Sequence, residues 1–133
     1  MNPNFVAYLI CVPVFVAIDM VWLLGPGRPF YVSELGTLMK TSPNLPAAVA
    51  FYLLYCVGII YFAVSGSVQN GNPSQALIQG AILGLIAYGT YDLTNLAVIN
   101  GFTLKIALID LIWGSILSGV ASYLVARITM ALT

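Results

Sequence analysis

The sequence predicts an all-α integral membrane protein: a bundle of four transmembrane helices, with a short interfacial segment between the first and the second. Hydrophobic residues make up 61% of the 133-residue chain and charged residues only 6%, whereas soluble domains carry about 25% charged residues. Four stretches each supply the roughly 20 largely apolar residues that a spanning helix needs. At this length we expect one domain, residues 1–133.

The four helices are expected where these apolar stretches lie. Pro13 falls inside the first stretch and should kink that helix, which membranes tolerate when neighbouring groups satisfy the freed carbonyl. The predicted spans are residues 4–25, 45–64, 76–99 and 104–131.

The first connection, residues 26–44, is long and carries Arg28, Glu34 and Lys40. Its middle, residues 30–39, mixes aromatic and apolar side chains with few charges, which is typical of a segment that lies at the membrane interface. We therefore expect the chain to run along the membrane surface between the first two helices.

The other two connections are shorter. Residues 65–75 are polar and uncharged, and an Asn-Pro pair ending at Pro73 can cap and open the third helix. In residues 100–103, Gly101 can adopt the left-handed conformation that ends a helix, and Thr103 can cap the next one. So tight a turn predicts that the third and fourth helices form an antiparallel hairpin.

Basic residues predict the orientation of the chain in the membrane. Arg28, Lys40 and Lys105 belong to the side of the first and third connections, and only Arg127 belongs to the other side. Because positively charged residues favour the cytoplasmic side, those two connections are expected in the cytoplasm and both termini outside it.

Acidic side chains inside the apolar stretches are the main functional feature of the sequence. Asp19, Asp92 and Asp110 all lie in predicted spans, where a carboxylate costs at least about 2.5 kcal/mol and therefore needs a partner, a proton or a function. Helical rise places all three at a similar depth, toward the side of the first and third connections. Tyr52 and Tyr55 of the second helix fall near the same depth, so four helices contribute to one polar layer.

Two stripes of small and polar residues recur every three or four positions, and each stripe therefore occupies one helix face. Small residues at this spacing let helix backbones approach closely in membranes. The stripes are Gly80, Gly84, Tyr88, Asp92 and Asn95 on the third helix, and Asp110, Gly114, Ser118 and Ser122 on the fourth. If the stripes face each other, Asp92 and Asp110 enter the interior of the bundle.

A short internal similarity relates the outer helices to each other, and another relates the inner helices. The repeated patterns are Asp-x-x-Trp at Asp19–Trp22 and Asp110–Trp113, and Tyr-x-x-Tyr at Tyr52–Tyr55 and Tyr88–Tyr91. Inverted repeats are common in transporters, although matches this short also arise by chance in so apolar a chain. Trp22 and Trp113 can be interpreted as members of the interfacial aromatic belt or as part of the polar layer.

Several segments together resemble one known family. They read A-I-D-M-V-W-L at 17–23, F-Y-L-L-Y at 51–55, Y-G-T-Y-D-L-T-N-L-A at 88–97 and D-L-I-W-G at 110–114. The chain resembles, over nearly its whole length, a bacterial family of predicted membrane proteins catalogued as domain of unknown function number two-one-seven-seven. The resemblance implies a small protein of the bacterial inner membrane with four helices, and it implies no activity.

Composition argues against several classes of function. The charges balance, so there is no basic patch of the kind that binds nucleic acid. Histidine is absent, which removes the commonest metal ligand and the usual acid–base group at neutral pH. The sequence contains no motif that predicts a metal site, a cofactor or a catalytic residue, and the one partner it requires is the lipid bilayer.

The favoured interpretation is a binding site, in a carrier or a channel, for a proton, a cation or a small polar or cationic ligand. Carboxylates so close together in a poorly hydrated site cannot all stay ionised, so some must carry protons or share a cation. Aromatic rings can face an organic cation. The candidate site residues are Asp19, Asp92, Asp110, Asn95, Tyr52, Tyr55, Tyr88, Tyr91, Trp22 and Trp113.

Two alternatives stay open. The first is an accessory subunit of a larger membrane complex, in which the acids are structural. Dimerisation into a homo-oligomer belongs instead to the carrier interpretation, where a second copy can complete the cavity. The structural pairs would be Asp110 with Lys105, Asp19 with Arg28, and Asp92 with Asn95 or a tyrosine. A membrane enzyme acting on a lipid is the third choice, with Asp92 and Asp110 holding Mg²⁺ or acting as acid and base.

Overall fold

The computed structural model describes residues 2–40 and 42–133, and these residues form helices and no strands. The elements in chain order are α1 (Pro3–Leu24), α2 (Gly27–Leu35), the 3₁₀ turn η1 (Gly36–Leu38), α3 (Leu45–Ile59), the π-helical turn η2 (Ile60–Val64), α4 (Ser65–Asn70), α5 (Pro73–Val98) and α6 (Leu104–Leu132). Four helical stretches are long and apolar enough to cross a membrane: α1, α3 through α4, α5 and α6. The fold class predicted from the sequence is therefore confirmed.

The second spanning helix is longer than predicted. Helical structure continues through η2 and α4 to Asn70, whereas the sequence placed a polar connection from residue 65 onward. No proline interrupts residues 65–70, so their polar side chains can continue the helix. Gly71 then ends it with a φ of 64°, and its N–H donates to the carbonyls of Ser67 and Val68. Because a π turn inserts an extra residue, α4 presents a different face from α3.

The ends of the α5–α6 hairpin largely follow the sequence. Pro73 is the first residue of α5, and Thr103 caps α6 by accepting the N–H of Ile106 at 3.2 Å. Gly101 is left-handed, with a φ of 85°, but α5 has already ended at Val98. Gly101 therefore shapes the turn rather than ending the helix.

The small-residue stripes of α5 and α6 face each other, as predicted. A Cβ at Gly84 would overlap the carbonyl oxygen of Gly114 and the side chain of Ser118, and a Cβ at Gly114 would overlap the ring of Tyr88. Ser115 also donates its hydroxyl to the carbonyl of Ala81 at 2.8 Å. These two helices form the most extensive contact in the fold because their backbones approach so closely.

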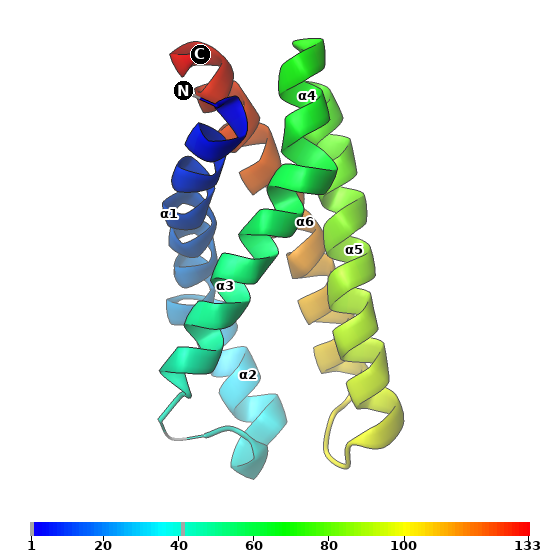
Figure 1. Cartoon of the computed structure of the whole chain (residues 1–133). Helices are drawn as coiled ribbons and strands as arrows, with labels where there is room; N and C mark the ends of the chain where they lie inside the picture. The colour runs from blue at the N-terminus through cyan, green and yellow to red at the C-terminus, as the bar shows by residue number, and fades with distance from the viewer. Residues whose placement is uncertain (1, 41) are drawn as a thin grey trace.

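The bundle is wider at one end than at the other. Figure 1 shows α3 leaning away from α5 toward the end that carries α2, and approaching α5 again where η2 and α4 follow. Accordingly, α5 packs against η2 and α4 but has hardly any contact with α3 in the part of the chain described. The two termini lie together at the opposite end from α2 (Figure 1).

Candidate functional site

The wider end of the bundle contains a cavity of about 450 Å³, which is within the range of small-molecule sites. It lies among α1, α2, α3, α5 and α6, and its wall is mostly aromatic with two carboxylates. The lining residues are Asp19, Trp22, Leu23, Tyr31, Phe51, Ala87, Tyr88, Tyr91, Asp110 and Trp113.

Asp19 joins three helices at one side of this cavity. Tyr52 of α3 donates its hydroxyl to Oδ2 of Asp19 at 2.7 Å, and Trp113 of α6 donates its indole N–H to Oδ1 at 3.1 Å. Only 7% of Asp19 is exposed. Each oxygen of this carboxyl group therefore accepts one hydrogen bond, from a different neighbouring helix.

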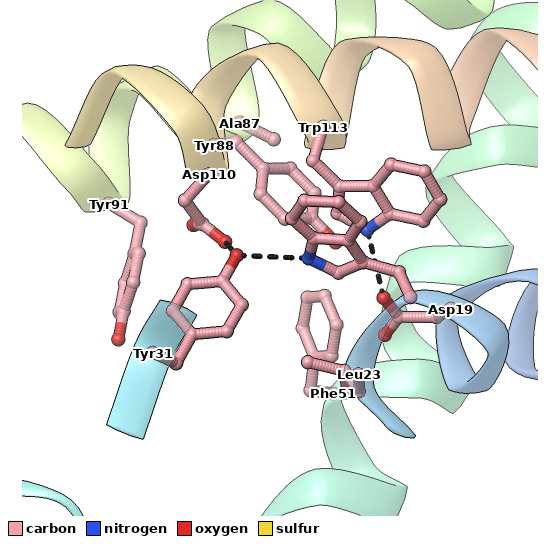
Figure 2. A pocket seen from close by; sticks show the side chains of 10 residues that line it. Asp19, Leu23, Tyr31, Phe51, Ala87, Tyr88, Tyr91, Asp110 and Trp113 are labelled. Atoms are coloured by element: carbon pink, nitrogen blue, oxygen red, sulfur yellow. Dashed lines mark hydrogen bonds between the residues drawn. The ribbon is translucent and has the colours of Figure 1, made fainter. Parts of the chain in front are cut away.

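At the other side of the cavity, a tyrosine of α2 holds Asp110 through a hydrogen bond. Tyr31 donates its hydroxyl to Oδ1 of Asp110 at 2.7 Å, and Tyr31 in turn accepts the indole N–H of Trp22 at 3.2 Å. Burial, together with the hydrogen bond to Asp110, raises the pKa of Tyr31. The hydroxyl therefore remains a neutral donor. Figure 2 shows this chain from the indole through Tyr31 to Asp110.

The two indoles stack on each other inside the bundle. Their ring centroids lie 4.9 Å apart, with an angle of 18° between the planes. Trp22 and Trp113 are both half-buried, and both line the cavity. Each indole N–H is directed inward to a polar partner, which supports the interpretation of these side chains as part of the polar layer.

Asp92 differs from the other two membrane acids. It is fully buried, and among the described residues neither carboxylate oxygen has a hydrogen-bond partner. It does not line the cavity, but its carboxyl lies next to that of Asp110. The structural pair that the sequence suggested for Asp92, with Asn95 or a tyrosine, is therefore not formed.

The other two structural pairs suggested by the sequence, Asp110 with Lys105 and Asp19 with Arg28, are not formed among the described residues either. Lys105 Nζ lies over the ring of Phe30, 5.7 Å from its centroid, while Asp110 is bonded to Tyr31. Asp19 is bonded to Tyr52 and Trp113 rather than to Arg28.

The structure thus brings together six of the ten residues selected from the sequence. Asp19, Trp22, Tyr88, Tyr91, Asp110 and Trp113 line the cavity. Tyr52 supports Asp19 from behind the wall, Tyr55 bonds Ser118 at 2.7 Å, and Asn95 is half-buried outside the cavity. Tyr31 and Phe51 were not selected. Phe51 adjoins Tyr52 in an aromatic segment, and that position could have identified it. Tyr31 lies in the connection between two spanning helices, where no helical repeat indicates which side chains enter the bundle.

Four apolar helices that enclose a polar and aromatic cavity define an integral membrane protein of the multi-pass α-helical class. A family model described as "Predicted membrane protein (DUF2177)" matches residues 4–126, so the chain belongs to this family. The resemblance found in the sequence is thereby confirmed. Neither the curated proteins nor the solved structures contain a match to the chain.

Proposed function

We propose that the protein binds a small organic cation, such as a protonated amine or a quaternary ammonium ion, in the cavity at the wide end of the bundle. The observation that carries this proposal is the composition of the cavity lining. Six aromatic rings and the carboxyls of Asp19 and Asp110 surround a volume of about 450 Å³. Faces of Trp and Tyr attract cations electrostatically, and they do so most strongly away from water.

The charge of the cavity supports a cationic ligand. Asp19 and Asp110 receive their hydrogen bonds from neutral tyrosine and tryptophan groups, which orient a carboxylate but leave its charge uncompensated. Lys105, the basic residue nearest to Asp110 in sequence, is directed to Phe30. A buried charge without a counter-charge is costly, so a bound cation would stabilise the site.

An organic cation fits this wall better than a bare metal ion does. Among the described residues, no three His, Cys, Asp or Glu side chains gather closely enough to hold a metal ion. The rings of Trp22, Tyr88 and Trp113 instead offer extended apolar faces, which match the alkyl or aryl groups of an organic ion.

Entry of the ligand from the lipid between α3 and α5 is supported by the exposure of two lining residues, Phe51 at 42% and Tyr91 at 60%. Phe51 on α3 and Tyr91 on α5 both line the cavity, although the two helices have hardly any mutual contact. A lipophilic cation can therefore enter sideways from the bilayer, as in a carrier. We regard the chain as one domain of the bacterial inner membrane with periplasmic termini, which directs the cavity toward the cytoplasm. A second copy of the chain can enclose the site further.

Intrinsic fluorescence tests this function directly. The chain has only two tryptophans, and both line the cavity, so their emission reports ligands that enter it. We would titrate purified protein with quaternary ammonium ions from choline to benzyltriethylammonium. Each ion would be compared with its neutral isostere, in which a quaternary carbon replaces the nitrogen. We expect saturable quenching by at least one ion and not by its isostere. Equal responses to both members of every pair would overturn the proposal.

A further inference from the structure

We propose that Asp92 and Asp110 form a proton-binding site behind the cavity wall, and that the proton held there and a cation in the cavity oppose each other's binding. The second half of this inference rests on the proposed function. The first half, the proton site, rests only on the surroundings of the two carboxyls.

Asp92 is the residue that requires a proton. Its side chain is fully buried, and neither oxygen accepts a hydrogen bond from any residue in the described part of the chain. An ionised carboxylate in such surroundings carries a large desolvation penalty that no partner offsets, whereas a protonated carboxyl is neutral and gains an O–H donor. Buried polar atoms without a partner are rare in folded proteins, so this one needs a physical explanation, and a bound proton supplies it.

Asp110 is positioned to accept a hydrogen bond from the O–H of protonated Asp92. Its carboxyl lies next to that of Asp92, and Tyr31 already donates to Oδ1, which leaves Oδ2 able to accept from Asp92. Two neighbouring carboxyls, one of them fully buried, cannot both be ionised without strong repulsion, and sharing one proton removes that repulsion.

The other titratable groups near the pair do not replace the proton. Tyr31 of α2 bonds Asp110, and Tyr88 and Tyr91 of α5 line the cavity together with Asp110 and Asp19. All three are tyrosines, which are neutral donors. Asp19 of α1 adds a further acid, and Lys105 of α6 extends over Phe30. The pair therefore sits among acids and neutral hydroxyls, and a proton is the available positive charge.

The position of the two acids links the proton to the ligand. Asp110 lines the cavity and Asp92 lies behind it. A cation beside Asp110 stabilises negative charge on the pair and favours release of the proton to the water. By reciprocity, the bound proton weakens cation binding by the same factor. Cation affinity should therefore rise as pH rises through the titration of the pair.

Infrared difference spectroscopy tests the proton site without any ligand. The chain has only four Asp and Glu side chains, so the carbonyl band of a protonated carboxyl can be assigned by single amide substitutions. At neutral pH we expect this band in the wild type and its loss in Asp92→Asn. In Asp110→Asn, Asp92 stays protonated and keeps its carbonyl band, but its O–H donates to a different acceptor. The band should therefore shift in frequency rather than vanish. Glu34→Gln, outside the site, should leave the band unchanged. A wild type without the band overturns the proton site, and so does a band that survives both Asp92→Asn and Asp110→Asn unmoved.

The linkage is tested by adding a quaternary ammonium ion that quenches tryptophan emission. The band should then shrink, a pH indicator should report proton release, and the affinity should increase severalfold with rising pH in the wild type but not in Asp92→Asn. A bound ion that changes neither the band nor the indicator overturns the linkage. If no ion binds, the proposed function fails, while the ligand-free spectra still decide the proton site.

Discussion

Trp113 donates its indole N–H to Asp19 at 3.1 Å and so joins α6 to α1 at the cavity wall. The relation is nearly reciprocal, because Trp22 of α1 donates to Tyr31, which donates to Asp110 of α6. The indole of each Asp-x-x-Trp segment is therefore linked to the acid of the other segment. Trp113 bonds Asp19 directly, and Trp22 is linked to Asp110 through Tyr31. The contacts of Tyr31 also join α2 to α1 and α6 at this end of the bundle.

Stacked indoles have a spectroscopic consequence. Two chromophores 4.9 Å apart should couple and give a split tryptophan signal in circular dichroism. Trp22→Phe leaves a single indole and should abolish the split signal, whereas Tyr61→Phe on the exposed surface should keep it. A split signal that persists in Trp22→Phe would show that the two rings are not coupled.

The hydroxyl of Tyr52 should stabilise the bundle through Asp19. Tyr52→Phe removes the donor at 2.7 Å from Oδ2 and leaves a nearly buried carboxyl oxygen unsatisfied. We expect the free energy of unfolding to fall by about 1 kcal/mol, which is typical of hydrogen bonds between membrane helices. The measurement is reversible unfolding in mixed micelles. Tyr61→Phe is the matched control, because Tyr61 follows on the same spanning helix and is 75% exposed; equal losses in both variants would refute the role of the Asp19 contact.

Close packing of α5 on α6 should make Gly84 intolerant of a side chain. Gly84→Ala places a Cβ against the backbone of Gly114 and against Ser118, and overpacking of this kind costs about 1–3 kcal/mol. At Gly58 of α3 a Cβ would meet nothing within 4 Å, so Gly58→Ala should be neutral or slightly stabilising. Thermal unfolding of the two alanine variants compares the sites, and similar melting temperatures would contradict the observed helix contact.

Tyr31 should stabilise the docking of α2 in a pH-dependent way. The pKa of Tyr31 is raised in the folded protein, so its stabilising effect is complete below the ordinary tyrosine pKa of about 10. Above that pH the unfolded chain loses the proton first, and stability falls as pH rises toward the folded pKa. The difference in unfolding free energy between wild type and Tyr31→Phe should therefore shrink above about pH 10. A constant difference would mean that the Tyr31 hydroxyl does not hold its proton more tightly in the folded state.

Helical periodicity explains which parts of this architecture the sequence could predict. Gly80, Gly84, Tyr88 and Asp92 repeat every four residues, and that spacing places them on one face whatever the partner. The facing of the two stripes, and with it the proximity of Asp92 to Asp110, follows from the short turn that pairs α5 with α6.

The features that the sequence did not predict depend on how the helices pack against one another. Tyr31 reaches the cavity because α2 lies at the wide end of the bundle, where Tyr31 bonds Asp110 and accepts from Trp22. No periodic pattern in a connection encodes that position. The extension of the second helix to Asn70 was missed because polarity alone indicated a loop, although no proline or left-handed glycine occurs before Gly71. Stacking of Trp22 on Trp113 requires two helices at a particular crossing, which a single sequence does not specify.

Asp110 and the surrounding rings form the proposed binding site for an organic cation. The most direct test is the affinity for a quenching quaternary ammonium ion, measured by tryptophan fluorescence in wild type, Asp110→Asn and Glu34→Gln. Glu34 carries the same charge, but it lies outside the cavity and its carboxylate contacts Thr103. We predict that Asp110→Asn weakens binding about tenfold or more, which corresponds to about 1.4 kcal/mol, and that Glu34→Gln binds as the wild type does. Unchanged affinity in Asp110→Asn, or an equal loss in both variants, would contradict the claim.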